Sequence, residues 1–284
     1  MLDTASWSVR GHSLSLRSPL IMGILNVTPD SFSDGGSFAD AAAAVDAGLR
    51  MVAQGAAIID VGGESTRPYA RPVAAMEESE RVLGVIEALA GEGVVVSIDT
   101  SKPEVAGAAI EAGAAIVNDV TGLTSPEMRS VCAAGGVGVV IMHMQGTPAT
   151  MQDDPHYDDV VDDVGRFLVT QSRAAIESGI RIESIALDPG IGFGKTHEHN
   201  LDLMRNLEVF THLGYPVLVG TSRKGFLGTI LEPVRGATEP AARDGATAAT
   251  IAAAVLAGAS IIRVHDVRLG VDVAVTAKAM VRKP

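Results

Sequence analysis

The chain has 284 residues, of which 47% are hydrophobic, and its formal net charge at pH 7 is −12. This negative excess argues against a general nucleic-acid surface, and no apolar run reaches the length of a membrane span, so we expect neither as a partner. The first 19 residues lack the apolar core of a signal peptide. The single cysteine, Cys132, cannot pair within the chain. Both features predict a cytoplasmic, reducing location.

Short apolar runs recur along the chain and alternate with helical patterns. The runs cover residues 20–27, 56–64, 94–100, 115–120, 138–144, 184–190, 216–222 and 260–266. Each is nearly continuously apolar, as is typical of a parallel strand covered on both faces. The clearest helical patterns lie at 40–55, 76–93, 103–113, 158–179 and 245–259. Eight strands alternating with helices predict an α/β fold, a (β/α)8 TIM barrel, with a doubly wound open sheet as the alternative.

No linker or low-complexity segment divides the chain. We therefore expect a single domain over residues 1–284, with the barrel itself at about 18–275. Residues 1–19 precede the first predicted strand. We expect this segment to cap the bottom of the barrel.

Polar side chains stand at the carboxyl end of every predicted strand. In chain order they are Asn26, Glu64, Asp99, Asn118 with Asp119, His143 with Gln145, Asp188, Ser222 to Lys224, and Arg263 with His265 and Asp266. One such residue usually caps the next helix. Eight polar tips are harder to explain by capping, and barrel enzymes build their active sites from these tips. The pattern predicts one shared polar pocket.

The chemistry of these tips divides into two groups. Asp99, Asn118 and Asp188 offer carboxylate and amide groups that suit a flat heterocycle with several N–H groups. Lys224, Arg263 and His265 are cationic or can become so, which suits a phosphate or pyrophosphate. Asn26 and the segment 30–34 offer hard oxygen ligands suited to Mg2+ held mostly by substrate phosphate. The residues alone thus indicate a heterocycle bearing a phosphate leaving group.

Two polar loops, at residues 27–40 and 62–73, follow the first two predicted strands. Both are rich in glycine, proline and serine, and each has one residue that could close on a ligand, Phe32 and Arg67. Long loops on this face of a barrel usually carry function. A third segment, PGIGFGK at 189–195, lacks the spacing of a Walker motif. We expect it to turn the chain behind Asp188.

With these residues in view, the chain resembles the dihydropteroate synthase family of the folate pathway over nearly all of residues 20–267. The resemblance rests on the motifs NVTPDSFSDGG, DVGGESTRP, SIDTSKPEVA, NDVTG, MHMQGTP, DPGIGFGK, GTSRKGFLG and RVHDV, in family order. It implies a (β/α)8 barrel and a transferase. The implied reaction condenses (7,8-dihydropterin-6-yl)methyl diphosphate with 4-aminobenzoate, giving 7,8-dihydropteroate and diphosphate.

The resemblance also implies a role for each matching position. The implied pterin-binding residues are Asp99, Asn118, Asp188 and Lys224. The implied diphosphate-binding residues are Asn26, Thr66, Arg263 and His265, with Asn26 also on the cofactor Mg2+. The implied residues for 4-aminobenzoate and its loops are Phe32, Thr66, Arg67, Pro68, Ser222 and Lys224. The implied catalytic set is Asp99, Asp188, Lys224, Arg263 and His265. A homodimer inhibited competitively by sulfonamides is implied as well.

One departure from the family lies after Arg67 and Pro68, where a glycine and small residues are common. Here Tyr69 and Arg71 are bulkier. Two other functions stay open, a pterin-dependent methyltransferase and a catalytically inactive pterin- or anion-binding paralogue. The filled polar positions favour an active enzyme, and the SRK and STRP motifs favour the synthase over the methyltransferase.

Overall fold

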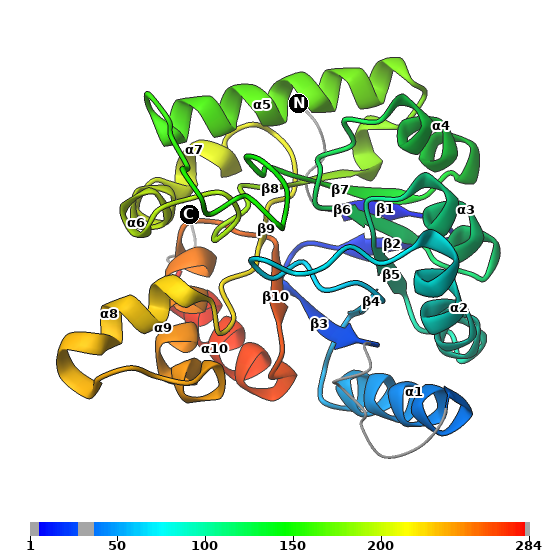
Figure 1. Ribbon diagram of the computed structural model, residues 1–284, viewed down its shortest axis with the longest axis horizontal. Helices are drawn as coiled ribbons and strands as arrows, with labels where there is room; N and C mark the ends of the chain where they lie inside the picture. Colours follow the sequence, from blue (N-terminus) through cyan, green and yellow to red (C-terminus); the bar gives the residue numbers. More distant parts are fainter. Residues whose placement is uncertain (1–5, 28–36, 282–284) are drawn as a thin grey trace.

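The computed structural model, which describes residues 6–27 and 37–281, has eight parallel strands arranged in a ring (Figure 1). The strands are β3 (Leu20–Asn26), β4 (Ile58–Gly62), β5 (Val96–Asp99), β6 (Ile116–Asp119), β7 (Gly138–Met142), β8 (Ile185–Asp188), β9 (Leu218–Val219) and β10 (Ile261–Val264). Their order is β8-β7-β6-β5-β4-β3-β10-β9. A single parallel bridge between Leu187 and Val217 completes the ring. The predicted (β/α)8 barrel is confirmed, and the open-sheet alternative is wrong.

Helices follow the strands and cover the outside of the ring (Figure 1). They are α1 (Ser37–Ala53), α2 (Ala75–Gly91), α3 (Pro103–Glu111), α4 (Pro126–Gly135), α5 (Val160–Glu177), α6 (His197–Arg205), α7 (Leu207–Thr211), α8 (Gly225–Arg235), α9 (Asp244–Leu256) and α10 (Val267–Met280). Four of them, α4, α5, α6 and α10, begin after a residue whose side chain accepts a hydrogen bond from the first helical turn. For example, the Asp159 side chain accepts hydrogen bonds from the first free N–H groups of α5. Of the helices described, none is both long and apolar enough to cross a membrane.

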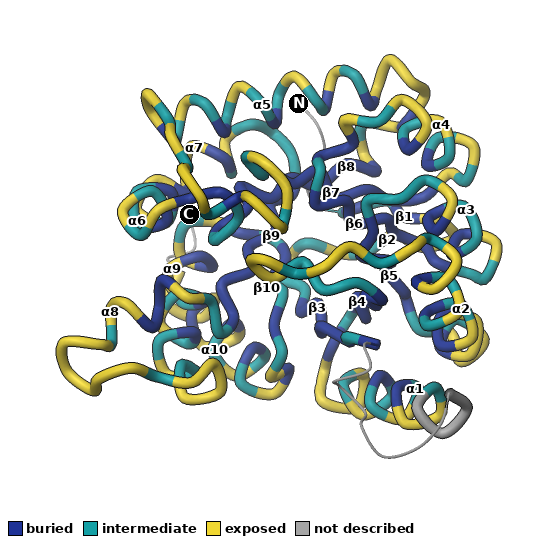
Figure 2. The backbone as a smooth tube through the Cα atoms, viewed as in Figure 1, coloured by how far each residue is buried: buried dark blue, intermediate teal, exposed yellow. Residues whose placement is uncertain are grey.

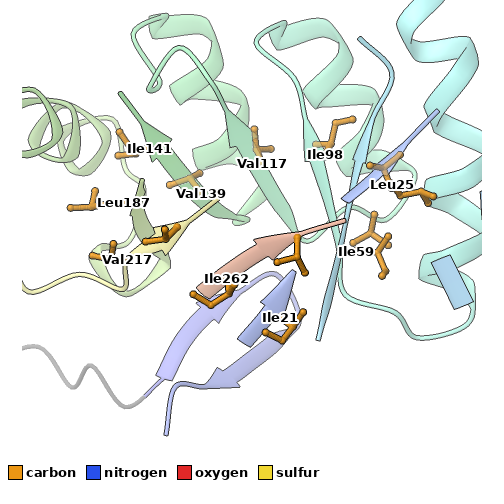
Figure 3. Packing of buried hydrophobic residues seen from close by; sticks show 14 of the residues in the cluster. Ile21, Leu25, Ile59, Ile98, Val117, Val139, Ile141, Leu187, Val217 and Ile262 are labelled. Carbon is orange, nitrogen blue, oxygen red and sulfur yellow. The ribbon is translucent and has the colours of Figure 1, made fainter. Parts of the chain in front are cut away.

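Two layers of apolar side chains hold the barrel together, because successive strand residues point to opposite faces. Outward-facing residues such as Ile21, Ile59 and Ile262 pack under the helices (Figure 3). Inward-facing residues such as Ile58 and Ile116 fill the barrel itself. Figure 2 shows this as a buried ring of strands inside helices whose outer sides are exposed. The continuous apolar runs in the sequence follow from this double burial.

A short antiparallel hairpin, β1 (Ser6–Val9) and β2 (His12–Ser15), lies at the amino ends of the strands. Trp7 is fully buried there, and its Nε1 donates to the Ser184 carbonyl at 3.0 Å, just before β8. Gly138 opens β7 so close to the hairpin that a Cβ would lie 2.5 Å from Val9. The amino end of the barrel is therefore covered, and the polar tips lie at the opposite end.

Candidate active site

The centre of the site is Arg263, which projects from β10 and joins two carboxylates from other strands. Its Nε donates to Asp60 Oδ2 at 2.6 Å, and its Nη2 donates to Asp99 Oδ2, also at 2.6 Å. Asn118 Nδ2 donates to the same Asp60 oxygen at 3.0 Å. Side chains from β4, β5, β6 and β10 thus meet inside the barrel, as predicted for three of the four.

Asp60 is the member of this cluster that the sequence did not reveal. It lies in the middle of β4, not at its tip, and it is fully buried. Its neighbours Ile59 and Val61 belong to the outer apolar layer, so the strand alternation turns Asp60 inward. A charged residue at an inward position of an otherwise apolar strand needs a buried partner. That signal could have identified it.

Two carboxylates share one guanidinium here, and each keeps one oxygen without a partner. Asp60 Oδ1 and Asp99 Oδ1 are buried and accept no hydrogen bond from the described part of the chain. Burial raises the pKa of Asp99 to about 7, although Arg263 opposes this rise, and the charge of Asp60 raises it further. Unpaired buried acceptors are rare in native proteins. A ligand that enters the barrel and brings N–H donors would satisfy these two acceptors.

We expect a pterin to displace a proton from Asp99. Near pH 6 the free protein holds this proton, because the pKa of Asp99 lies at about 7. A ligand that donates N–H groups favours the ionised carboxylate and lowers that pKa. Calorimetry of pterin binding in two buffers of different ionisation enthalpy should report proton release at pH 6 and little release at pH 8. Equal proton exchange at both pH values would contradict this role for Asp99, and Asp99→Asn should remove the difference.

Asp188 and Lys224 form a second charged group across the barrel. Asp188 ends β8, is buried, and accepts a hydrogen bond from the Gly190 N–H at 2.7 Å. Burial raises its pKa, and Lys224 opposes that rise. Lys224 donates to the Ile191 carbonyl and lies 4.4 Å from the centre of the Phe193 ring. Burial lowers the pKa of Lys224 to about 8.

The segment 189–195 turns the chain behind Asp188 and supplies the partners of Lys224. Its last residue, Lys195, is buried and also escaped the sequence predictions. Lys195 Nζ is 2.9 Å from the Phe193 carbonyl and 3.0 Å from His143 Nδ1, and it also contacts the His143 carbonyl at 3.3 Å. Burial lowers the pKa of Lys195 well below its usual value, and the nearby Asp188 opposes that change. The contacts of Lys195 tie this turn to the end of β7.

Ser222 and His265 follow β9 and β10 and contact each other. Ser222 Oγ is 2.9 Å from His265 Nδ1 and also accepts a hydrogen bond from the His265 N–H at 3.3 Å. Burial lowers the pKa of His265 to about 4, and the nearby cations, first Arg263 and then Arg223, lower it further. His265 is therefore neutral at pH 7. The sequence analysis described His265 as a residue that can become cationic, and in this arrangement it carries no charge at pH 7.

Not every polar tip enters this pocket. Both carboxylate oxygens of Asp119 accept hydrogen bonds from the turn that follows it, one from the Thr121 N–H and one from the Leu123 N–H. Asp266 caps α10. Glu64 accepts from Lys102 at 2.5 Å and from the Val73 N–H at 2.8 Å, so it closes the base of the loop 62–73. Asp119, Asp266 and Glu64 thus serve local turns, a helix cap and a loop base. The prediction that all eight polar strand ends share one pocket included these residues wrongly.

The loop 62–73 lies over the carboxyl end of the barrel. Arg67 is exposed, and its charge reaches His265, whose pKa it lowers. Thr66 is half-buried and Pro68 is exposed, and neither makes a side-chain hydrogen bond within the described part of the chain. Phe32, predicted to face the same ligand, lies outside the described residues.

Tyr69 stands where the family resemblance implies a glycine, and its backbone has the conformation that favours one. Ala70 N–H donates to the Arg67 carbonyl at 3.1 Å, which closes a turn with Tyr69 third. Tyr69 has φ of 63°, in the left-handed region that favours glycine. Its N–H donates to the Pro148 carbonyl at 3.0 Å and its side chain is 66% exposed. The larger residue therefore fits without filling the pocket.

Asn26 ends β3 beside Asp99, and the two side chains flank Gly62. A Cβ at Gly62 would lie 3.7 Å from Asn26 Oδ1 and 3.9 Å from Asp99 Oδ2. Within residues 6–27 and 37–281, no group of three or more His, Cys, Asp or Glu side chains could hold a metal ion alone. The Asn26 amide is a hard oxygen donor, which fits a Mg2+ ion that takes most of its ligands from substrate phosphate and water.

Comparison with known proteins places this site in a family. A family model described as pterin binding enzyme matches residues 22–265. Dihydropteroate synthase from Escherichia coli K12 is 46% identical over 264 residues, which is 93% of this chain and 92% of that protein.

Solved structures agree with this result. A Xanthomonas albilineans dihydropteroate synthase with 4-aminobenzoic acid has a TM-score of 0.90 at 43% identity, covering 99% of this chain and 100% of the other. A Yersinia pestis dihydropteroate synthase with a sulfonamide drug has a TM-score of 0.89 at 42% identity, covering 96% of this chain and 98% of the other. The chain therefore belongs to the dihydropteroate synthase family of pterin binding enzymes.

Proposed function

We propose that this pocket condenses (7,8-dihydropterin-6-yl)methyl diphosphate with 4-aminobenzoate to give 7,8-dihydropteroate and diphosphate. The observation that carries the proposal is the buried acceptor set beside Asn118, in which Asp60 Oδ1 and Asp99 Oδ1 have no hydrogen-bond partner among residues 6–27 and 37–281. A 2-aminopyrimidinone ring offers several N–H donors in one plane, which such acceptors would satisfy. The cationic side chains of Arg263 and Lys224 and the hydroxyl of Ser222 lie near these acceptors, where the diphosphate of the substrate would lie.

The pterin half binds to Asp99, Asn118, Asp188 and Lys224. Both aspartates are buried, and burial raises the pKa of each, so a ligand that carries N–H donors or develops positive charge stabilises their ionised forms. Lys224 sits between Asp188 and the Phe193 ring and can donate to a ring carbonyl or nitrogen. This binding keeps the reacting methylene group at the carboxyl end of the barrel.

The diphosphate half binds near Arg263, His265, Asn26 and Thr66. Arg263 uses Nε and Nη2 on the two carboxylates, so its remaining nitrogen, Nη1, is available to a phosphate oxygen. When the Ser222 hydroxyl donates to Nδ1 of the neutral His265, the Nε2–H of that ring is a donor for a phosphate oxygen. Mg2+, held by Asn26 and phosphate oxygens, would neutralise charge on the departing diphosphate.

The reaction breaks the bond between the pterin methylene carbon and the diphosphate oxygen, and the electron pair leaves with diphosphate. The aminobenzoate nitrogen then forms a bond to that carbon and loses one proton. Asp99 and Asp188 stabilise positive charge that develops on the electron-rich ring. Water would capture the same carbon, so we propose that the loop 62–73, with Arg67 and Pro68, closes over the site and excludes it.

The aminobenzoate half lies by Ser222 and Lys224, under the loop 62–73. A benzoate carboxylate suits the hydroxyl and ammonium groups of these two residues. Sulfonamides, which resemble aminobenzoate in shape, would compete there, as the sulfonamide complex of the Yersinia pestis relative suggests. We further propose a cytoplasmic location, because the single cysteine of the chain is a free thiol. We also propose a homodimer, because helices expose apolar residues such as Val234 and Leu256.

The test is to mix both substrates with Mg2+ and measure pyrophosphate release. We expect release that requires both substrates and gives dihydropteroate. A methyltransferase would instead modify a reduced pterin without releasing pyrophosphate. Binding of pterin without turnover would identify a non-catalytic binding protein. Either result would overturn the proposal.

A further inference from the structure

The turn that carries Ser222 and Lys224 is held in an unfavourable backbone conformation. Lys224 N–H donates to the Thr221 carbonyl at 3.2 Å, which closes a four-residue turn between β9 and α8. Arg223 occupies its third position with φ of 62°, in the left-handed region. Glycine or asparagine is usual there, because a Cβ crowds the following carbonyl. Strain of this kind persists only where surrounding structure enforces it, and it concentrates at functional sites.

The amino end of α9 enforces this conformation through the residue itself. Arg223 Nε and Nη2 donate to Asp244 Oδ1 and Oδ2 at 2.9 and 3.1 Å, a two-point pairing. The Arg223 N–H donates to Thr247 Oγ1 at 3.1 Å, and the Arg223 carbonyl accepts from Arg243 Nη1 at 3.0 Å. Both backbone groups of the strained residue and its whole side chain are therefore bound by residues 243–247.

Neither partner of the Arg223–Asp244 pair is needed to fill the core. Their side chains are 28% and 33% exposed, so the pair reaches solvent, and neither side chain belongs to the apolar core. A planar guanidinium on a carboxylate at two points fixes direction as well as distance. The pair can therefore set the turn without being essential for folding.

We propose that Arg223 and Asp244 are positioning residues for the aminobenzoate side of the site. The pair holds the turn so that Ser222 Oγ stays on His265 Nδ1 and Lys224 Nζ stays on the Ile191 carbonyl. If the turn relaxed to negative φ at Arg223, the flanking side chains would change direction. This inference rests on the proposed function, because the turn matters only if Ser222 and Lys224 bind substrate.

The experiment compares Arg223→Ala, Arg223→Gly, Asp244→Asn and the double variant Arg223→Ala/Asp244→Asn with the wild type. We expect Arg223→Ala and Asp244→Asn each to lower kcat/KM for aminobenzoate about tenfold, which corresponds to about 1.4 kcal/mol. The affinity for a pterin without diphosphate should fall less than kcat/KM does, because Lys224 is one of four pterin contacts and Ser222 is none of them. The double variant should be no worse than either single one, because one interaction is lost in all three. Arg223→Gly should recover part of the loss, since glycine accepts φ of 62°.

A matched control is Asp202→Asn, which removes a similar Arg–Asp pair on the exposed side of α6, where Arg205 Nη1 is 2.9 Å from Asp202 Oδ1. It should behave as the wild type. Normal activity in Asp244→Asn would overturn the inference, and with a damaged Arg223→Ala it would mean that Arg223 acts on substrate directly. Additive losses in the double variant would also overturn it. An inactive wild type would overturn the proposed function and this inference together, whereas an active wild type with unaffected variants would overturn this inference alone.

Discussion

Arg263→Met should lower the free energy of unfolding by about 3–5 kcal/mol, because it leaves the buried carboxylates of Asp60 and Asp99 without their shared cation. The methionine keeps most of the side-chain volume, so the change is mainly one of charge. We expect the midpoint of thermal unfolding at pH 8 to fall by roughly 10 °C. Pterin and pterin diphosphate should both bind weakly, since the pterin acceptors depend on this arginine.

The pH dependence of the lost stability shows whether the Arg263→Met effect comes from the missing charge or from altered packing. Loss of Arg263 raises the pKa of Asp99 still further, because this cation opposes the rise caused by burial. A raised pKa means that the folded protein binds the proton more tightly than the unfolded chain, so the deficit should shrink as pH falls from 8 to 5. Arg263→Lys keeps one charge without two directed bonds and should show a smaller loss. An Arg263→Met variant within about 1 kcal/mol of the wild type at pH 8 would contradict this account.

Asp188→Asn should weaken pterin binding by about 100-fold with little loss of stability. The amide keeps the shape of the side chain but replaces one acceptor with a donor that faces the N–H groups of the ligand. A buried donor left without an acceptor costs about 1–3 kcal/mol, and more where charge is involved. Calorimetry with a pterin ligand measures the affinity, and thermal unfolding measures the stability.

Asp119→Asn is the matched control for this variant. Asp119 is also a buried carboxylate at a strand end, but the turn after β6 uses both of its oxygens. We expect this control to lose stability and to keep its pterin affinity. If both variants kept full affinity for pterin, Asp188 would have no direct role in binding the ring.

The barrel could be predicted from the sequence because each strand is covered on both faces. Double burial leaves a continuous apolar run, and the polar residue after it marks the carboxyl end of the strand. Even β9, with only Leu218 and Val219 in regular pairing, falls within the predicted run 216–222. The hairpin β1–β2 has no such signal, since most of its residues are partly exposed.

The candidate site was less predictable because its contacts join distant parts of the chain. Arg263 and Asp60 are 203 positions apart, and no local pattern indicates that β10 and β4 turn these side chains toward each other. The neutrality of His265 likewise depends on burial and on cations from other elements. The sequence was enough to predict which residues carry charged or polar groups. Which of these groups pair with each other could be seen only in the folded structure.

A single-turnover reaction tests the central claim most directly. Enzyme in excess over pterin diphosphate is mixed with Mg2+ and 4-aminobenzoate, quenched at intervals, and assayed for pyrophosphate, dihydropteroate and hydroxymethyl-dihydropterin. The account predicts that pyrophosphate and dihydropteroate rise together in equal amounts, because one bond breaks for each that forms and the proposed closure of the site would exclude water. Pyrophosphate that accumulates with the hydroxymethyl product, or an absence of pyrophosphate with both substrates bound, would contradict it.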